Sequence, residues 1–294
     1  MRPDERRGLW LALVAVLCFS TSPVLLIWAD PLSPYEKTFW RMVFGALTVL
    51  TMALVQGRRP HYTRRDGPRF LLFGLVTAVH FLTFIAALNF TSIAHALTAT
   101  YTAPVFVTLF SAIFLKEPIA SSKYVGILIV VTGIAVLVGF QPVLTTRMLI
   151  GDGLAFISAV TFGFYSVIGR SQRNTYPLLT YTFATYAVAG LWTLPPAIAT
   201  WTPEAYGPLQ TLSIMAAGVV PLGIGHTLYN AAIRRTHATY VNLIATQEVT
   251  GGVLLGVLVL GQVPTLNSLV GATVTLAGTA LVLVWGGPGV AADA

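Results

Sequence analysis

The sequence predicts an all-α integral membrane protein whose ten transmembrane helices form two inverted five-helix repeats. Of the 294 residues, 55% are hydrophobic and only 9% are charged, whereas soluble domains carry roughly 25% charged residues. The apolar residues fall into ten segments close to the length of about 20 residues that a bilayer requires. The second half of the chain also repeats the first half at one constant offset.

Small residues make the repeat visible. Gly45 corresponds to Gly190, which is 145 positions later (190 − 45). Gly126 corresponds to Gly271 at the same offset. A biased composition would produce scattered matches, but this single register also superimposes the hydrophobic segments from end to end, as internal duplication predicts. The two predicted repeat domains are residues 8–139 and 153–286.

The ten expected spans follow one another with short connections, so consecutive helices should be antiparallel neighbours. The first span could pass for a signal peptide because Met1–Arg7 is basic. Its counterpart in the second half is an interior span, so we expect this first span to be retained. In order, the expected spans are 9–29, 35–55, 69–88, 94–115, 123–140, 151–169, 178–199, 209–231, 238–260 and 267–286.

Local signals mark where some of these helices begin or break. Ser33 and Glu36 have the spacing of a capping box, which predicts the start of the second span. Pro23 should kink the first span because proline removes a backbone donor. Pro104 in the fourth span and Gly223 in the eighth span are further expected kinks or hinges.

Polar content separates the helices into two groups. Spans five and ten carry almost no polar side chains and each has two glycines seven positions apart on one face, which predicts peripheral packing helices. Spans three, four, six, eight and nine contain histidine, tyrosine, asparagine, glutamine or glutamate. Lipid tolerates such groups poorly, so these side chains should face the interior of the bundle.

The distribution of the residues behind the net charge of +7 indicates how the chain is oriented in the membrane. With the N-terminus inside, 14 of the 17 lysines and arginines fall in segments on the inner side. This is the positive-inside bias, and it predicts cytoplasmic N- and C-termini and no nucleic-acid partner. Because each repeat has an odd number of spans, the second repeat should be inverted relative to the first.

Two histidines are candidates for a central cavity. His80 and His226 lie one position out of repeat register, so they could reach similar depths from opposite repeats. The alternative is a pair of neutral histidines bonded to backbone carbonyls. The other candidates for substrate contact are Thr77, Phe84, Tyr101, Phe164, Tyr165, Tyr229, Asn230 and Gln247.

Glu248 is the only acidic residue clearly within a span, which makes it a functional-site candidate. It could contact a substrate ammonium group, carry a proton, or join a structural hydrogen-bond network. Arg41 lies about two turns inside the second span, where its charge needs a structural partner or a substrate carboxylate.

Motifs for enzymes, cofactors and metals are missing from the sequence. No glycine-rich nucleotide loop, no HExxH and no GxSxG pattern occurs, and the histidines and Cys18 lack metal-ligand spacing. The loops are too short for a sizeable soluble domain. We therefore expect neither an enzyme nor a bound cofactor.

Ordered motifs near the ends of both halves resemble a known family. Thr102-Ala103-Pro104, followed by Leu115-Lys116-Glu117-Pro118 and the glycines of span five, resembles the repeat end of EamA-type transporters in the drug/metabolite transporter superfamily. Thr246-Gln247-Glu248-Val249 and the glycines of span ten resemble the second copy. Arg41 matches the arginine that is usual in the second helix of that family.

The resemblance implies ten helices in two inverted repeats, with a cavity lined by helices one, three, four, six, eight and nine. It also implies export of amino acids, metabolites or toxic compounds by alternating access. The histidines and aromatic residues are most similar to YddG-type exporters of aromatic and other amino acids. The chain departs from the family pattern at Ser20, Val249 and Gln262, and it has no acidic residue in span one, unlike the small multidrug members.

The sequence therefore predicts a secondary transporter of the bacterial-type inner membrane that exports aromatic and other neutral amino acids. The alternative is a proton-coupled exporter of lipophilic cations, drugs or other metabolites on the same fold. The expected partners are a small-molecule substrate and the lipid bilayer, with a proton as a candidate coupled ion.

Overall fold

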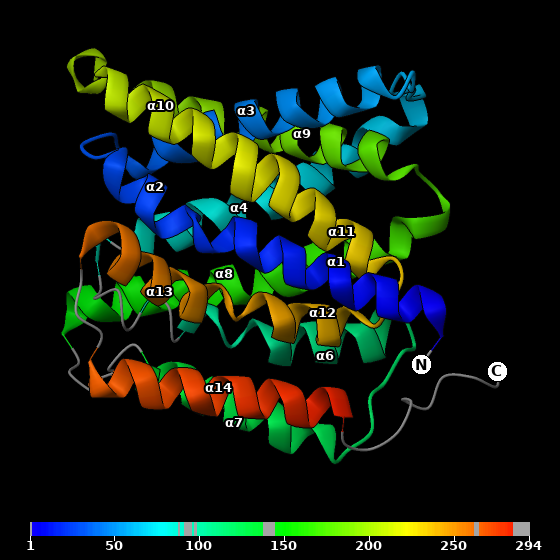
Figure 1. Ribbon diagram of the computed structural model, residues 1–294. Helices are drawn as coiled ribbons and strands as arrows, with labels where there is room; N and C mark the ends of the chain where they lie inside the picture. The colour runs from blue at the N-terminus through cyan, green and yellow to red at the C-terminus, as the bar shows by residue number, and fades with distance from the viewer. Residues whose placement is uncertain are drawn as a thin grey trace.

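The computed structural model describes residues 2–87, 89–90, 96, 99–137, 145–261 and 265–284. Across these residues the regular secondary structure is helical, with no strand. The long helices run approximately parallel or antiparallel to one another in one bundle (Figure 1). The fold class is therefore all-helical, as the sequence predicts.

The helices of the first half are α1 (Pro3–Ser20), α2 (Ser22–Trp28), α3 (Pro34–Val55), the short η1 (Arg64–Asp66), α4 (Gly67–Ala87), α6 (Ala103–Phe114) and α7 (Lys123–Leu137). Those of the second half are α8 (Thr146–Ser171), η2 (Gln172–Asn174), α9 (Leu178–Ala199), η3 (Pro203–Ala205), α10 (Pro208–Ala217), the π-helical η4 (Gly218–His226), α11 (Thr227–Ile233), α12 (Ala238–Ala245), α13 (Glu248–Leu260) and α14 (Leu266–Val284).

Six stretches of the described chain are long and apolar enough to cross a membrane, by length and composition. They are Pro3–Trp28, Pro34–Val55, Arg64–Ala87, Thr146–Asn174, Pro208–Ile233 and Ala238–Val259. The other four expected spans overlap α9 and the shorter described helices α6, α7 and α14. Parts of spans four, five and ten, the predicted domain ends at 139 and 286, and Gln262 lie outside the described residues.

The helix of the first span is interrupted at Thr21, between α1 and α2. The Ser20 hydroxyl donates to the carbonyl oxygen of Val16 over 2.8 Å, and the Thr21 hydroxyl donates to that of Cys18 over 2.7 Å. Pro23 follows in the first turn of α2, where its missing N–H leaves no broken bond. The hydroxyls therefore satisfy carbonyls at the interruption.

The start of α3 is held by the predicted capping box, which the structure confirms. The Glu36 N–H donates to the Ser33 hydroxyl oxygen over 3.2 Å, and the Ser33 N–H donates to the Glu36 carboxylate over 3.0 Å. The same carboxylate accepts bonds from the Thr202 N–H and the Tyr206 hydroxyl in the second half. Glu36 is thus a buried structural carboxylate that joins the two halves.

The main helix contacts join the two halves of the chain. Helix α3 packs on α9, α4 on α8, α6 on α12, and α7 on α14, and α1 packs on η4, α11 and α12. Figure 1 shows α14 beside α7 at one edge of the bundle, and α1 next to α11 and α12. The core consequently lies between the halves, where an internal site would receive side chains from both.

The contact of α7 with α14 depends on glycine. A Cβ atom at Gly133 would lie 2.7 Å from the backbone nitrogen of Thr275 on α14, which is closer than real packing allows. A Cβ atom at Gly153 would meet nothing within 4 Å. The two glycines therefore form a matched pair for testing this helix contact.

We expect Gly133→Ala to lower the free energy of unfolding by about 1–3 kcal/mol, because the added methyl group forces the two helices apart. Gly153→Ala should leave the stability unchanged or slightly higher, since alanine has the better helix propensity. Thermal unfolding of the purified protein in detergent measures both. Equal effects of the two substitutions would contradict the close α7–α14 contact.

Candidate functional site

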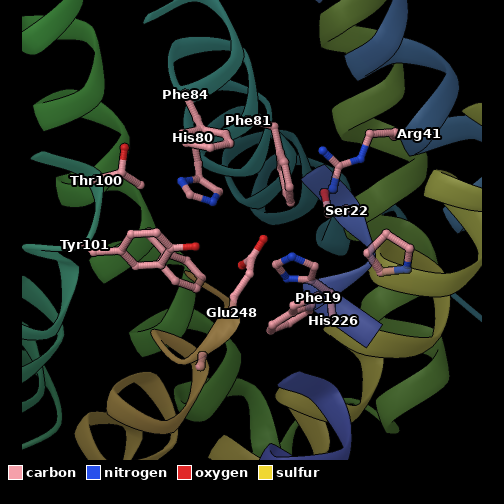
Figure 2. A pocket seen from close by; sticks show the side chains of 13 residues that line it. Phe19, Ser22, Arg41, His80, Phe81, Phe84, Thr100, Tyr101, His226 and Glu248 are labelled. Atoms are coloured by element: carbon pink, nitrogen blue, oxygen red, sulfur yellow. The ribbon is translucent and has the colours of Figure 1, made fainter. Parts of the chain in front are cut away.

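A small cavity lies in the middle of the bundle and receives side chains from both halves (Figure 2). Its volume is about 50 Å³, which leaves room for a few water molecules. The lining residues come from α1, α2, α3, α4, α8, η4, α12, α13 and the segment before α6. They are Phe19, Ser22, Arg41, His80, Phe81, Phe84, Thr100, Tyr101, Phe162, Pro221, His226, Ala245 and Glu248.

His80 on α4 is held by α8. Its Nδ1 atom lies 3.0 Å from the carbonyl oxygen of Ser158 and 2.9 Å from the Ser158 hydroxyl oxygen. The imidazole stacks on Phe162, with ring centroids 4.7 Å apart and an interplanar angle of 11°. The Nδ1 atom is therefore engaged by Ser158 of α8, and the Nε2 atom remains for contacts in the cavity.

His226 is the last residue of the π-helical stretch η4, and aromatic rings surround its imidazole. Its ring centroid lies 4.5 Å from that of Phe19 and 5.2 Å from that of Phe81. Its Nδ1 atom is 3.4 Å from the Tyr165 hydroxyl oxygen, which itself accepts a 2.6 Å hydrogen bond from the Asn230 side chain. The side chains of Tyr165 and Asn230 thus orient the His226 ring.

Glu248 begins α13, directly after the break that follows α12. A carboxylate in the first turn of a helix interacts favourably with the helix dipole. Figure 2 shows the Tyr101 hydroxyl and the rings of His80 and His226 around this carboxylate. The Glu248 carboxyl group therefore lies at the cavity, close to three polar groups from other helices.

Arg41 on α3 brings the opposite charge to the same cavity. Only 3% of its surface is exposed, and its guanidinium carbon lies 5.3 Å from the ring centroid of Phe81. Its Nε atom is buried without a hydrogen-bond partner. Among the described residues no ion pair within 4 Å joins Arg41 to Glu248, although both line the cavity.

The site thus combines one arginine and one glutamate with a wall of aromatic rings. A buried charge that lacks a close partner is costly, so the unpartnered Nε atom of Arg41 marks this cavity as the candidate site. No cluster of three or more histidine, cysteine, aspartate or glutamate residues that could hold a metal occurs in the described part of the chain. The arrangement suits binding of a small polar molecule that has an apolar side.

Several residues proposed from sequence surround this cavity. His80, Phe84, Tyr101, His226 and Glu248 line it directly. Three others form a buried layer around His226: Tyr165, Tyr229 and Asn230. In that layer the Tyr229 hydroxyl lies 2.6 Å from the Ser166 hydroxyl, and the Asn230 amide also donates to the carbonyl oxygen of His226. Thr77 is buried on α4, where its hydroxyl donates to the carbonyl oxygen of Phe73.

Two of the proposed contact residues do not line this cavity, and their contact with a substrate stays a prediction. Phe164 stacks on Phe110 of α6, with ring centroids 4.2 Å apart. Gln247 donates a 3.0 Å hydrogen bond to the Thr279 hydroxyl of α14. Each lies one or two positions from a cavity residue, and one position along a helix turns a side chain by about 100°.

The three expected hinge positions lie at irregular backbone. Pro23 follows the interruption between α1 and α2, and Pro104 occupies the first turn of α6. Gly223 lies inside η4, where a Cβ atom would come within 2.7 Å of the Thr48 Cβ atom of α3. All three are thus near the cavity-lining segments, and their movement stays a prediction.

Three aromatic residues of the cavity wall, Phe19, Phe81 and Phe162, are absent from the residues predicted from sequence. Phe162 lies four positions after Ser158, on the face of α8 that also carries the buried Tyr165. Phe81 and Phe19 belong to helices rich in apolar residues, where periodicity alone does not separate a lining ring from a packing ring. For Arg41, the sequence leaves two roles open: a structural residue, or the contact for a substrate carboxylate.

Comparison with known proteins places these features in a family. The model of the EamA-like transporter family matches residues 6–139 and 149–284. The chain is 24% identical to the uncharacterized transporter YxxF of Bacillus subtilis over 263 residues, which cover 86% of this chain and 82% of the relative. It is 27% identical to the pseudopaline exporter CntI of Pseudomonas aeruginosa over 246 residues, covering 80% and 81%.

A solved crystal structure has the same fold. It superimposes with a TM-score of 0.83 at 20% sequence identity and covers 94% of this chain and 96% of the other chain. At this level of identity the similarity concerns the fold.

Proposed function

We propose, from the premise that this chain belongs to the EamA-like transporter family, that it exports small zwitterions, with aromatic and other neutral amino acids favoured. The observation that carries this proposal is the pair of opposite charges in the central cavity. Arg41 and Glu248 line the same space without forming an ion pair with each other. A zwitterion has one group for each of them.

The chemistry of both residues fits an amino acid backbone. A guanidinium presents two parallel N–H donors, which match the two oxygens of a carboxylate. The Glu248 carboxylate, beside the Tyr101 hydroxyl, would accept from the substrate ammonium group. The rings of Phe81, Phe84 and Phe162 would then surround an apolar or aromatic side chain.

The cavity volume supports a transport cycle with a change of shape. Ligand sites for small molecules usually have about 300–1,000 Å³, which far exceeds the free volume of about 50 Å³ at this site. Substrate entry therefore requires the surrounding helices to separate, as alternating access would do. One relative is named as an exporter, which favours the outward direction for this chain.

The helix contacts also support our proposal of two inverted repeats. The pairs α3–α9, α6–α12 and α7–α14 each join an expected span to its own counterpart in the other half. The contact of α1 with η4 and α11 has its counterpart in the contact of α4 with α8. Exchanging the halves leaves this set of contacts unchanged, as a two-fold relation requires, and positive-inside loops would place both termini in the cytoplasm.

A second candidate function is proton-coupled export of lipophilic cations. The observation that favours it is Glu248, a carboxylate in an aromatic cavity, since aromatic faces attract cations. Arg41 in the same cavity argues against it, because its guanidinium would repel a substrate that has only a positive charge. The two candidates therefore differ in the substrate charge that they require.

We expect proteoliposomes that contain the protein to transport phenylalanine at least tenfold faster than phenethylamine or 3-phenylpropionate. These analogues lack the carboxylate and the ammonium group, respectively, so each leaves one buried charge without a partner. Radiolabelled flux, measured with and without a pH gradient across a plasma-membrane-like bilayer, tests this. Faster transport of phenethylamine would favour the cation exporter, and no amino acid flux across a broad panel would contradict the zwitterion proposal.

A further inference from the structure

A second and larger cavity lies between α3, α9 and α11, at the end of the bundle that the charge pattern predicts to be cytoplasmic. Its volume is about 600 Å³, and it shares no lining residue with the central cavity. The lining residues are Met52, Ala53, Gln56, Arg58, Arg59, Pro177, Leu178, Leu179, Thr180, Thr227, Leu228, Ala231 and Arg235.

The charged residues that line this cavity are all arginines. Three arginines line it, and none of its lining residues is acidic. Arg58 and Arg59 are exposed, and in the described part of the chain their side chains make no ion pair or hydrogen bond. Arg235 donates to the carbonyl oxygen of Ala231 and lies 3.5 Å from the exposed carboxylate of Asp4. The electrostatic potential in the cavity is therefore positive.

The start of α9 adds to that potential. Leu178 and Thr180 in its first turn line the cavity, and the helix has no side-chain cap. The free N–H groups of an uncapped helix start favour an anion. The backbone donors at the start of α9 thus accompany the three guanidinium groups.

The loop that carries Arg58 and Arg59 is fastened to α9. The Tyr62 hydroxyl donates to the carbonyl oxygen of Thr180 over 2.7 Å. The Tyr176 hydroxyl donates to the Asp66 carboxylate over 2.6 Å. These two bonds tie the loop to the start of α9 and hold the arginines near the cavity.

We propose that this cavity binds a phosphate ester whose remaining part is apolar or lies against an apolar surface. Arginine recognises phosphate through two parallel hydrogen bonds, and the N–H groups at the start of α9 supply more donors. Met52, Leu178 and Leu228 give the cavity an apolar side, which suits the glycerol and first acyl carbons of an anionic phospholipid. A soluble phosphate ester offers the same charged group.

The test compares two double variants of the full-length protein purified in neutral detergent. Arg58→Gln/Arg59→Gln removes two lining charges, and Arg64→Gln/Arg65→Gln removes two exposed charges from the same loop outside the cavity. The unfolding temperature is measured while phosphatidylglycerol, phosphatidylcholine or glycerol phosphate is titrated. Since all four arginines are exposed, both double variants should fold. Arg235→Gln, just after the end of α11, removes the third lining arginine.

We expect phosphatidylglycerol to raise the unfolding temperature of the wild type and of the Arg64/Arg65 variant. The apparent affinity should fall roughly tenfold or more in the Arg58/Arg59 variant, because charge-assisted hydrogen bonds are lost. A response to glycerol phosphate as well identifies a site for soluble phosphate esters, and a response to the lipid alone identifies a lipid site. Equal affinities in both double variants, an equal response to phosphatidylcholine, or no response in the wild type would overturn the proposal.

Discussion

Replacing Arg41 by glutamine should lower the affinity for phenylalanine about 100-fold while leaving the affinity for phenethylamine undiminished. The guanidinium is almost fully buried and lines the central cavity, so it is placed to receive the substrate carboxylate. Removing one partner of a buried, hydrogen-bonded charge pair costs about 2–5 kcal/mol, and ~3 kcal/mol corresponds to roughly 100-fold in affinity. Phenethylamine has no carboxylate and loses nothing by this change.

The measurement is isothermal titration of both ligands with the purified protein, together with its unfolding temperature. Arg234→Gln is the matched control, because Arg234 also places its guanidinium over a ring, 5.0 Å from the Tyr181 centroid, but outside the cavity. That control should lower stability and leave the ratio of the two affinities unchanged. If Arg41→Gln weakened both ligands equally and lowered the unfolding temperature, Arg41 would be a structural residue.

Arg41→Lys separates charge from geometry. Lysine keeps the positive charge but lacks the two parallel donors of the guanidinium, so it should bind phenylalanine with an intermediate affinity. Full affinity in this variant would show that the charge alone is sufficient.

Much of the fold is predictable because its signals are short in range or repeated. The glycine pairs Gly126/Gly271 and Gly133/Gly278 mark helices α7 and α14, and the structure packs these helices on each other. Pro34 and the capping box mark the start of α3 within one residue. Such features depend on backbone geometry and burial, which leave a clear pattern in the residues themselves.

The site is only partly predictable. A polar residue in an apolar span needs a partner, and that requirement directed attention to His80, His226 and Glu248, which the structure places around one cavity. Phe164 and Gln247 lie outside the cavity lining, because membership of the lining depends on helix rotation to within one residue. Tertiary packing sets that rotation, and the sequence of one helix does not report the shape of its neighbours.

The π-helical stretch shows the same limit more sharply. Gly218 to Gly223 indicates a break in the eighth span, but the structure has a continuous wide helix over Gly218–His226. The wide turns rotate His226 relative to a regular α-helix, which affects where its ring points. No count of residues from Pro221 would have placed that ring beside Phe19.

Replacing Glu248 by glutamine should lower the affinity for phenylalanine about 100-fold while leaving the affinity for 3-phenylpropionate undiminished or raising it. The variant loses the charge that would pair with the substrate ammonium, at a cost of the same ~3 kcal/mol. 3-Phenylpropionate lacks that ammonium, and the wild-type carboxylate repels it. Together with Arg41→Gln, the variant assigns each end of the zwitterion to one residue.

Glu36→Gln is the matched control for this substitution. Glu36 is a buried carboxylate outside the cavity that accepts hydrogen bonds from Ser33, Thr202 and Tyr206. Its replacement should lower stability by about 1–3 kcal/mol, because bonds to a charged group are lost, without changing the ratio of the two ligand affinities. Titration of both ligands and the unfolding temperature measure these effects.

Flux measurements distinguish the ammonium contact from the proton-carrier role of Glu248. If Glu248 contacts the substrate ammonium group, Glu248→Gln should lower phenylalanine exchange between equal pools and gradient-driven uptake by similar factors, because both processes require substrate binding. As a proton carrier, it would leave exchange nearly intact and abolish only the response to a pH gradient. Since the carboxylate shares its cavity with the Arg41 guanidinium, whose Nε atom has no hydrogen-bond partner, we expect the first outcome.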